Sequence, residues 1–310
     1  MLKEAFRPLY FWLWEDSLGS VPIGFVQRAV VEQLQQMPPE LRGDIVIDDS
    51  GSVGNIKLIL GGSTVEDRSK FIEQVTQHWR KQQTFHILST WRNEPWPIYD
   101  REGQLCLNVE RSAAGLFGVN RYGVHMTAYV KNASSSHGIK IWVPKRAATK
   151  SNYPGMLDNT VAGGLMTGED PFECIIREAD EEASLPESVV RTLAKPVGTV
   201  SYIHITDKRA GGEAGLIYPE FQWVYDLELP DHVIPVPKDG EAESFTLCDI
   251  EAIQHNLALG RFKPNCALVM IDFFIRHGIL NRENEVDLDE ICRHLRRTLP
   301  FPGPRQTPQP

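Results

Sequence analysis

A group of acidic residues at helical spacing stands in the middle of the chain. Glu178 and Glu182 are four positions apart, and Glu181 lies beside them. On a helix this spacing brings three carboxylates into an arc of about 100°, where like charges repel one another. A hard divalent cation relieves such repulsion because it takes oxygen ligands and keeps water molecules for phosphate groups. The spacing therefore predicts a site for Mg²⁺, with Mn²⁺ as the alternative ion.

The residues around these glutamates predict a loop followed by a helix. Asp170 is a favourable N-cap, Pro171 suits the first helical position and Pro186 ends the run. Glu173 is expected to complete a capping box with Asp170. The apolar positions at steps of three and four would face a sheet, and they are Phe172, Ile175, Ala179 and Ala183. One face of this helix is thus expected to be packed and the other acidic.

Three residues around the acidic face would support such a site. Arg177 can reach Glu181 at i+4 or Glu169 in the preceding loop, and so hold the carboxylates in register. Gly163 and Gly164 would let the backbone approach a substrate closely. A solvated helix face is the ordinary interpretation of adjacent glutamates. A chance match of six fixed positions, however, has a probability on the order of 10⁻⁵ in a chain of this length.

The full pattern resembles the box of the Nudix hydrolases, G-x5-E-x7-R-E-U-x-E-E-x-G-U, where U is aliphatic. The matching positions are Gly163, Glu169, Arg177, Glu178, Ala179, Glu181, Glu182 and Leu185. Ser184 stands where the family has its second glycine, just past the helix end, where φ is often positive. We expect this serine to cost about 1 kcal/mol or less. The resemblance implies an α/β fold, an α/β/α sandwich around a mixed sheet, and Mg²⁺-dependent cleavage of a diphosphate.

Further segments resemble the Nudix subgroup related to thiamin pyrophosphokinase. They are Gly123-Val-His125, residues 146–164 and residues 219–226. The resemblance implies a smaller α+β N-terminal domain at residues 1–113 and a Nudix domain at 114–285. A C-terminal helix and a Pro-rich tail are expected at 286–310, and no kinase activity is expected because no room remains for a kinase domain.

The resemblance also implies a substrate and roles for residues. The substrate would be thiamin diphosphate, or an oxidised or altered analogue, cleaved to the monophosphate and phosphate. ADP-ribose and nucleotide sugars are the alternative. Glu178, Glu181 and Glu182 would be the metal ligands. The general base would be one of Glu178, Glu241 or Glu243, and Glu220 competes for the same role.

Two other classes of function remain open at this point. One is a catalytically silent Nudix fold that serves as a binding module, against which the intact glutamates argue. The other is an isomerase of prenyl diphosphates, which needs an accessible cysteine such as Cys106. His125 is expected to be a packed histidine, and Cys174 an inert buried thiol.

The N-terminal part offers aromatic side chains but no second acidic cluster. Prolines in the segment 91–97 argue against a helix or a central strand, so we expect an exposed loop in which Trp91 and Trp96 contact substrate. Core packing is the alternative for both. Helices are expected at 24–36 and after a capping box formed by Ser63 and Glu66.

Composition excludes several classes of protein. Hydrophobic residues make up 42% and charged residues 24%, as in a soluble globular chain. The net charge of −9 argues against a nucleic-acid partner, and no apolar run approaches the roughly 20 residues of a membrane span. Five scattered cysteines without a C-x-x-C pair predict a reducing, cytoplasmic compartment. The expected partner is a small-molecule diphosphate, and the oligomeric state stays open.

Overall fold

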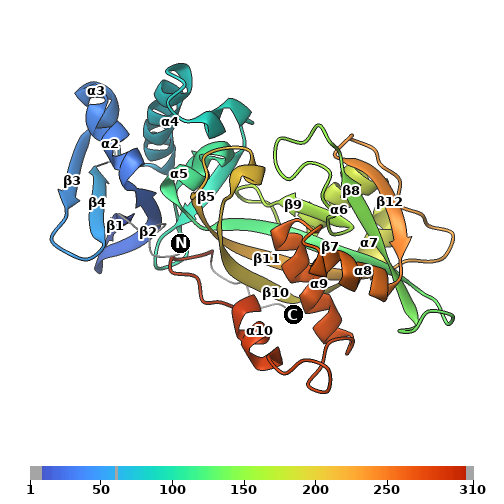
Figure 1. Ribbon diagram of the computed structural model, residues 1–310. Helices are drawn as coiled ribbons and strands as arrows, with labels where there is room; N and C mark the ends of the chain where they lie inside the picture. Colours follow the sequence, from blue (N-terminus) through green and yellow to red (C-terminus); the bar gives the residue numbers. More distant parts are fainter. Residues whose placement is uncertain (1–8, 60–61, 305–310) are drawn as a thin grey trace. The chain divides into compact units, whose positions relative to one another are not determined.

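A computed structural model describes residues 9–59 and 62–304 of the chain (Figure 1). The described residues divide into two compact units. The first unit draws on Met1–Arg121, Ile203–Glu220 and Leu299–Pro310, and the second on Tyr122–Tyr202 and Phe221–Thr298. No helix within the described ranges is long and apolar enough to cross a membrane.

The first unit is an α+β structure built on a four-stranded sheet of order β2-β1-β4-β3. Strand β1 pairs antiparallel with β2 and parallel with β4, while β3 pairs antiparallel with β4. These strands are β1 (Leu9–Asp16), β2 (Gly19–Gln27), β3 (Asp44–Asp48) and β4 (Gly54–Ile59). The helices are α2 (Arg28–Gln36), α3 (Pro39–Arg42), α4 (Val65–Lys81) and α5 (Ala114–Phe117). A separate hairpin joins β5 (Pro95–Tyr99) to β6 (Leu105–Glu110).

Two local predictions for this unit are wrong in detail. The helix expected at 24–36 begins at Arg28, because Phe25 and Val26 pair with β1 as part of β2. The capping box of α4 uses Thr64 and Asp67, one residue later than expected. The apolar face of α4 is nevertheless buried as its spacing requires, and the ring of Trp79 stacks 6.2 Å from that of Phe117.

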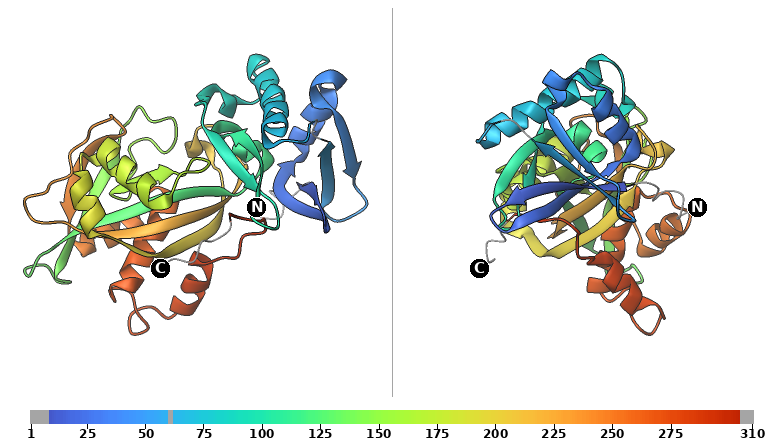
Figure 2. Two further views of the ribbon diagram at one scale, coloured as in Figure 1. Left: turned by 180° about the vertical axis from the view of Figure 1, so that it is seen from behind. Right: turned by 90° about the vertical axis from the view of Figure 1, so that its left-hand side faces the viewer.

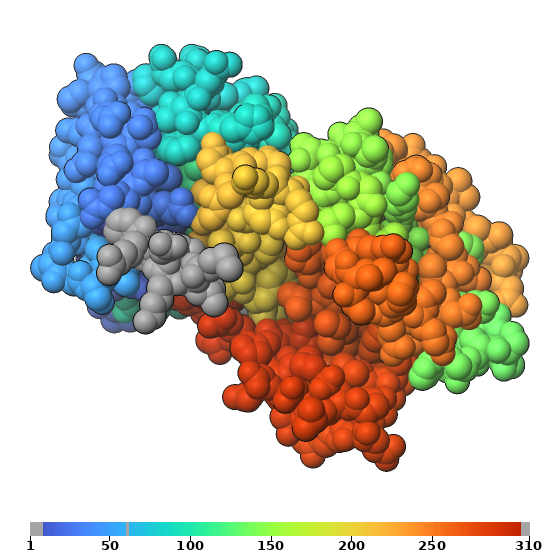
Figure 3. Space-filling model, in the orientation of Figure 1, coloured from blue at the N-terminus to red at the C-terminus, as the bar shows by residue number. Residues whose placement is uncertain are grey.

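Residues 203–220 belong to the first unit although they lie far along the chain. The carboxylate of Glu213 accepts hydrogen bonds from the backbone N–H groups of His86 and Ile87, the latter at 3.1 Å. A Cβ atom at Gly212 would stand 2.8 Å from Ile87 Cδ1. In Figure 3 this segment, in gold, lies against the cyan residues of the N-terminal part. The first unit is thus completed by a distant part of the sequence.

The second unit is built on a sheet of order β10-β11-β7-β8-β12, with β9 also paired to β7. Its strands are β7 (Arg121–Lys131), β8 (Ile139–Arg146), β9 (Val161–Gly164), β10 (Ala194–Ile205), β11 (Ile217–Glu228) and β12 (Ala242–Cys248). Strand β7 pairs antiparallel with β9 over residues 123–126 and with β8 over residues 129–131. Strands β8 and β9 therefore pair with different parts of β7, which leaves a gap between them. Residues that precede β9 lie in this gap.

Helices cover both faces of this sheet. Figure 2 shows α6 (Pro171–Ala183) on one face and α9 (Pro264–Arg276) on the other. On the α9 side, Met270 and Phe273 pack with Ile141 and Val143 of β8. The remaining helices are α7 (Glu187–Leu193), α8 (Ile250–Ala258) and α10 (Leu288–Leu295).

Asp158, Asn159 and Thr160 fill the gap between β8 and β9. The hydroxyl of Thr160 accepts from the Ala128 N–H at 2.9 Å and donates to the Trp142 carbonyl at 2.7 Å. Asn159 contacts the buried His125 through a 2.8 Å hydrogen bond between Oδ1 and Nδ1. His125 is thus a packed histidine, as expected. This polar segment holds β8 and β9 apart and forms part of the wall of the site described next.

Candidate active site

The start of α6 follows from local chemistry. The Asp170 carboxylate accepts hydrogen bonds from the N–H groups of Phe172 at 2.8 Å and Glu173 at 3.2 Å, so it is the predicted N-cap. The predicted capping box is wrong, because the Glu173 carboxylate pairs instead with Arg191, at 2.6 Å. Ile175, Ala179 and Ala183 are buried as expected, while Phe172 is half-buried and contacts the ring of Tyr225.

The end of α6 explains the departure from the family box. Ser184 has a φ of 53°, in the left-handed region that a glycine adopts without strain. Its hydroxyl donates to the carbonyl of Val236 at 3.0 Å. This hydrogen bond offsets part of the backbone cost, and the helix ends where the family pattern requires.

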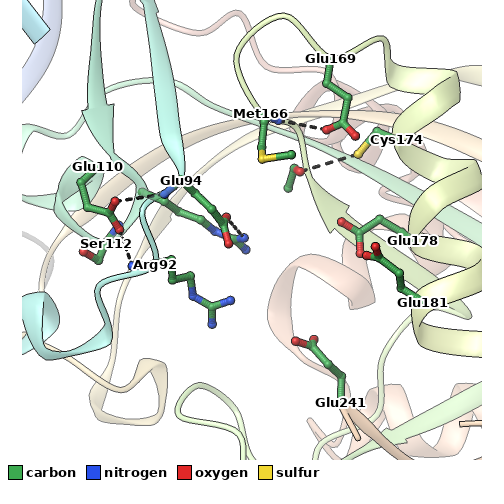
Figure 4. A network of polar contacts seen from close by, with 12 residues as sticks. Arg92, Glu94, Glu110, Ser112, Met166, Glu169, Cys174, Glu178, Glu181 and Glu241 are labelled. Carbon is green, nitrogen blue, oxygen red and sulfur yellow. Dashed lines mark hydrogen bonds and ion pairs between the residues drawn. The ribbon is translucent and has the colours of Figure 1, made fainter. Parts of the chain in front are cut away.

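Arg177 is the centre of the predicted carboxylate array. Its Nε lies 2.9 Å from Glu169 Oε1, and its Nη1 lies 3.0 Å from Glu178 Oε1 and 2.9 Å from Glu181 Oε2. Burial alone would lower the pKa of Arg177, but Glu169 and Glu178 raise it. Glu169 also accepts from the N–H of Met166 at 3.3 Å, as Figure 4 shows. Arg177 thus contacts both partners that its spacing predicted.

Glu182 behaves differently from its neighbours. Its Oε2 accepts a 3.0 Å hydrogen bond from the Ala162 N–H in β9. Burial raises the pKa of Glu182 well above its usual value, and the nearby charge of Glu178 raises it further. Negative charge is therefore unfavourable at this carboxylate unless a cation is present.

Gly163 makes room for this array. A Cβ atom at residue 163 would lie 2.2 Å from Cδ of Glu178. The carbonyl of the adjacent Gly164 faces Cys174 Sγ at 3.7 Å. Burial raises the pKa of Cys174, as expected for an inert thiol. The glycine at 163 is thus required by the position of a glutamate; contact with a substrate stays a prediction for both glycines.

A cavity of about 20 Å³ lies beside Glu182. This volume is enough for about one water molecule. Polar side chains line it, namely Arg146, Asp158, Asn159, Thr160, Glu182 and Glu241.

The buried Arg146 pairs with Asp158 at 2.7 Å. Burial would raise the pKa of Asp158, but the charges of Lys263 and Arg146 lower it. Sequence reasoning did not single out Arg146 or Asp158, although both lie in the segment 146–164 that carries the subgroup resemblance.

The candidates for the general base lie in different surroundings. Glu241 borders the cavity and pairs with Lys150 at 2.6 Å. Glu243 is exposed and pairs with Lys145 at 2.8 Å. Glu220 belongs to the first unit and pairs with Arg121 at 3.4 Å. The structure thus places Glu241 beside Glu182.

The donor set fits a hard divalent cation. Figure 4 shows Glu178 and Glu181 extending from α6 toward the space that Glu241 faces from its own loop. Carboxylate oxygens are the ligands that Mg²⁺ prefers, and Arg177 is shared among three of the glutamates. Within the ranges that the structure describes, no group of three His, Cys, Asp or Glu side chains is already gathered as a metal cage. Glu181 would have to leave Arg177 to join one.

The tryptophans of the first unit differ from expectation. Trp96 is 1% exposed within β5, and its Nε1 donates to the Asn120 carbonyl at 3.3 Å. Trp91 is half-buried, donates to Asn93 at 2.8 Å and lies under the guanidinium of Arg80. The prediction of an exposed loop carrying both rings is therefore wrong, because Trp96 is a core residue.

Cys106 does not suit the chemistry of an isomerase. Its side chain is 2% exposed. Burial, with a contribution from the charge of Asp100, raises its pKa to about 12. Such a thiol is protonated and inaccessible near neutral pH.

Comparison with known proteins identifies the family of this chain. Residues 122–266 match the NUDIX domain, and residues 18–121 match a domain of unknown function, DUF4743. Nudix hydrolase 20, chloroplastic, of Arabidopsis thaliana is 32% identical over 275 residues, which are 86% of this chain and 68% of that protein. The chain belongs to the Nudix hydrolases.

Other proteins are also similar to this chain. The uncharacterized protein YJR142W of Saccharomyces cerevisiae is 35% identical over 97% of this chain and 86% of its own length. Nudix hydrolase 24, chloroplastic, of Arabidopsis thaliana is 35% identical over 66% of this chain and 53% of its own length. A crystal structure of a protein from Deinococcus radiodurans has a TM-score of 0.41 at 20% identity, covering 57% of this chain and 98% of that one.

The expected fold and enzyme class are thereby confirmed. The chain has the Nudix fold with a mixed sheet, preceded by a smaller α+β part, and it is a hydrolase that acts on pyrophosphate bonds. The match of the N-terminal residues is to a domain of unknown function, so it does not connect the chain to thiamin.

Proposed function

We propose that this Nudix hydrolase uses Mg²⁺ to cleave the diphosphate of a small organic molecule, thiamin diphosphate or an oxidised or altered analogue, to the monophosphate and phosphate. The charge of the α6 face carries the metal part of this proposal. Glu169, Glu178 and Glu181 share one guanidinium, and Glu182 beside them is a carboxylate whose pKa is raised. Without a cation, the repulsion among these carboxylates would lower the stability of the fold.

Each residue of the site has a role in this proposal. Glu178, Glu181 and Glu182 would hold the metal, which when bound neutralises phosphate charge and makes a water molecule more acidic. Arg177 keeps the glutamates of α6 in register. Ala162 fixes one oxygen of Glu182 through its backbone N–H.

Glu241 is the general base that the surroundings favour. It borders the cavity that Glu182 also lines, and the cavity has room for about one water molecule. Glu243 is exposed on β12 and is held by Lys145. Glu178 stays an alternative because it faces the same space. Replacing Glu241 by Gln should therefore lower kcat more than the same change at Glu243, and equal effects would return the role to Glu178.

The choice of thiamin is supported by residue-level resemblance and by the aromatic side chains near α6. Tyr225 contacts Phe172 of α6, so strand alternation places Trp223 on the same sheet face. Trp223 is half-buried and lies 6.2 Å from the ring of Tyr122. A quaternary thiazolium stacks favourably on such rings, worth about 0.5–2 kcal/mol. We therefore assign to Trp223 the contact with substrate that was predicted for Trp96.

A parallel assay tests the substrate. Thiamin diphosphate, its oxidised analogue, ADP-ribose and nucleotide sugars are incubated with Mg²⁺, and both products are identified by mass. We expect the fastest cleavage for a thiamin compound, with a raised KM in Trp223→Ala. The substrate contact of Trp91 stays a prediction that Trp91→Ala would test in the same assay. Faster cleavage of ADP-ribose would replace thiamin by a nucleoside diphosphate. Binding without any product would indicate a silent module. The cytoplasmic location and the absence of a nucleic-acid partner stay predictions.

A further inference from the structure

Two lysine–glutamate pairs connect the residues around β8 with β12. Lys150 Nζ lies 2.6 Å from Glu241 Oε1, and Lys145 Nζ lies 2.8 Å from Glu243 Oε2. The Lys150 side chain is 14% exposed, whereas that of Lys145 is 47% exposed. The Glu241 side chain is 37% exposed and that of Glu243 52%, and an ion pair is weaker the more its groups are exposed to water. The two pairs therefore have the same chemistry but different strength, and only the first involves a carboxylate that lines the cavity.

The loop that carries Lys150 is firmly anchored. Arg146 donates from Nε to the Tyr153 carbonyl at 3.2 Å and from Nη2 to Asn152 Oδ1 at 2.7 Å. The Ala147 N–H donates to the Glu241 carbonyl at 2.9 Å, and the Lys150 N–H donates to the Ala147 carbonyl at 3.2 Å. Lys150 is thus a positioned cation beside the cavity, unlike a lysine on a mobile surface loop.

The two arginines of this site are shared among several acceptors. Arg146 is divided between Asp158, Asn152 and Tyr153. Arg177 is divided between Glu169, Glu178 and Glu181. Lys150 holds Glu241 as its ion-pair partner, and an ammonium group exchanges one partner for another without a change of geometry. A diphosphate, which carries more negative charge than a carboxylate, can take the place of Glu241.

We propose that Lys150 binds a phosphate of the substrate, and that this exchange releases Glu241 from its ion pair. The inference rests on the proposed function of the site. Before substrate binds, Lys150 holds the carboxylate that is the candidate base. When a phosphate takes the ammonium group, Glu241 loses this ion pair and can accept a proton from water. Lys150 thereby couples the arrival of a diphosphate to the availability of the base.

Binding of methylenediphosphonate, a diphosphate analogue whose P–C–P bridge is not hydrolysed, tests the exchange without turnover. Calorimetry with Mg²⁺ would compare the wild type with Lys150→Met, Lys145→Met, Glu241→Gln and the double variant Lys150→Met/Glu241→Gln. We expect Lys150→Met to weaken binding about tenfold and Lys145→Met to change it less than about twofold. Lys150→Arg should retain most of the affinity, and thermal melting would verify folding of every variant.

Glu241→Gln gives the sharpest result, because it removes the competitor for Lys150. This variant should bind the analogue several-fold more tightly while its kcat falls, and it should have no effect on binding when Lys150 is already Met. Weaker binding in Glu241→Gln, or equal losses in Lys150→Met and Lys145→Met, would overturn the proposal. The binding measurement tests the role of Lys150 even if the enzyme cleaves none of the assayed diphosphates. If the enzyme cleaves a diphosphate but Lys150→Met binds the analogue as tightly as the wild type, the exchange is refuted and the proposed hydrolase function is not.

Discussion

The second unit contains two clusters of carboxylates with opposite charge balance. In the cluster of Asp226 and Asp272, the acids are matched by Arg276 and Arg296, and His277 forms a further hydrogen bond with Asp226. Arg276 lies 2.5 Å from Asp226 and 2.7 Å from Asp272, Arg296 lies 2.7 Å from Asp272, and His277 lies 2.9 Å from Asp226. Burial would raise the pKa of Asp226, but hydrogen bonds from His277 and Arg276 lower it.

On the acidic face of α6 the carboxylates outnumber the cations. Arg177 serves Glu169, Glu178 and Glu181, and the pKa of the neighbouring Glu182 is raised by burial and by Glu178. Matched charges hold elements of a fold together, since each carboxylate is neutralised where it lies. Where carboxylates outnumber the cations beside them, a further cation or a proton relieves the repulsion. The difference separates a structural network from the one that we propose to bind the metal.

The largest effect is expected on α6. Glu182→Gln should lower kcat by about 10²–10⁴-fold, because charge stabilisation by a metal is worth several kcal/mol at about 1.36 kcal/mol per decade of rate. Its melting temperature should not fall, since the change removes a repelled charge. Glu173→Gln is the matched control, because Glu173 lies on the same helix and pairs with the exposed Arg191. Steady-state kinetics would measure both, and near-normal turnover in Glu182→Gln would remove it from the ligand set.

The opposite result is expected for the balanced cluster. Asp226→Asn should lower the free energy of unfolding by roughly 2–4 kcal/mol, because it leaves the half-buried Arg276 with one carboxylate partner instead of two. Its kcat should stay near the wild-type value at temperatures where it is folded. Glu228→Gln, which breaks an exposed pair with Lys131, should cost less than about 1 kcal/mol in the same urea titration. A loss of turnover without loss of stability would refute the structural role.

A fall in pH should also lower the stability that the cluster of Asp226 and Asp272 contributes. The pKa of Asp226 is lowered in the folded state, so its contribution to stability is present above the usual carboxyl pKa of about 3.9 and is lost as pH falls through the folded value. The free energy of unfolding should therefore decrease in acid less steeply in Asp226→Asn than in the wild type. Urea titrations at a series of pH values would show this, and parallel curves would contradict it.

The smallest effect is expected at the end of α6. Ser184→Gly relieves the backbone cost of a positive φ but removes the hydrogen bond to Val236, so stability should change by less than about 1 kcal/mol. Ser184→Val removes the hydroxyl and places a branched side chain at the same φ, and should be less stable than either. Thermal melting would rank the three proteins, and a valine variant as stable as the glycine variant would contradict this account of Ser184.

Local signals in the sequence were sufficient to predict where α6 begins and ends. Asp170 and Pro171 set its start, and Ser184 ends it at a positive φ, since capping depends on residues a few positions apart. Arg177 likewise meets Glu169 and Glu181 as its spacing predicted. These are contacts within one loop and one helix.

Contacts between distant segments could not be predicted in this way. Trp96 is a buried residue of the two-stranded hairpin formed by β5 and β6. The prolines beside it are tolerated there because few ladder hydrogen bonds are lost. The pairing of Lys150 with Glu241 depends on β8 and β12 being neighbours, which no local pattern indicates. In the same way, nothing in residues 203–220 shows that they complete the first unit.

Equilibrium binding of Mn²⁺ tests most directly whether the carboxylates of α6 form a metal site. The electron paramagnetic resonance signal of the free ion measures this binding. The wild type should bind Mn²⁺, and Mg²⁺ should compete for the same site. Affinity should fall at least about tenfold in Glu182→Gln and change less than about twofold in Asp226→Asn. A wild type that leaves the Mn²⁺ signal unchanged, or equal affinities in the two variants, would contradict the account.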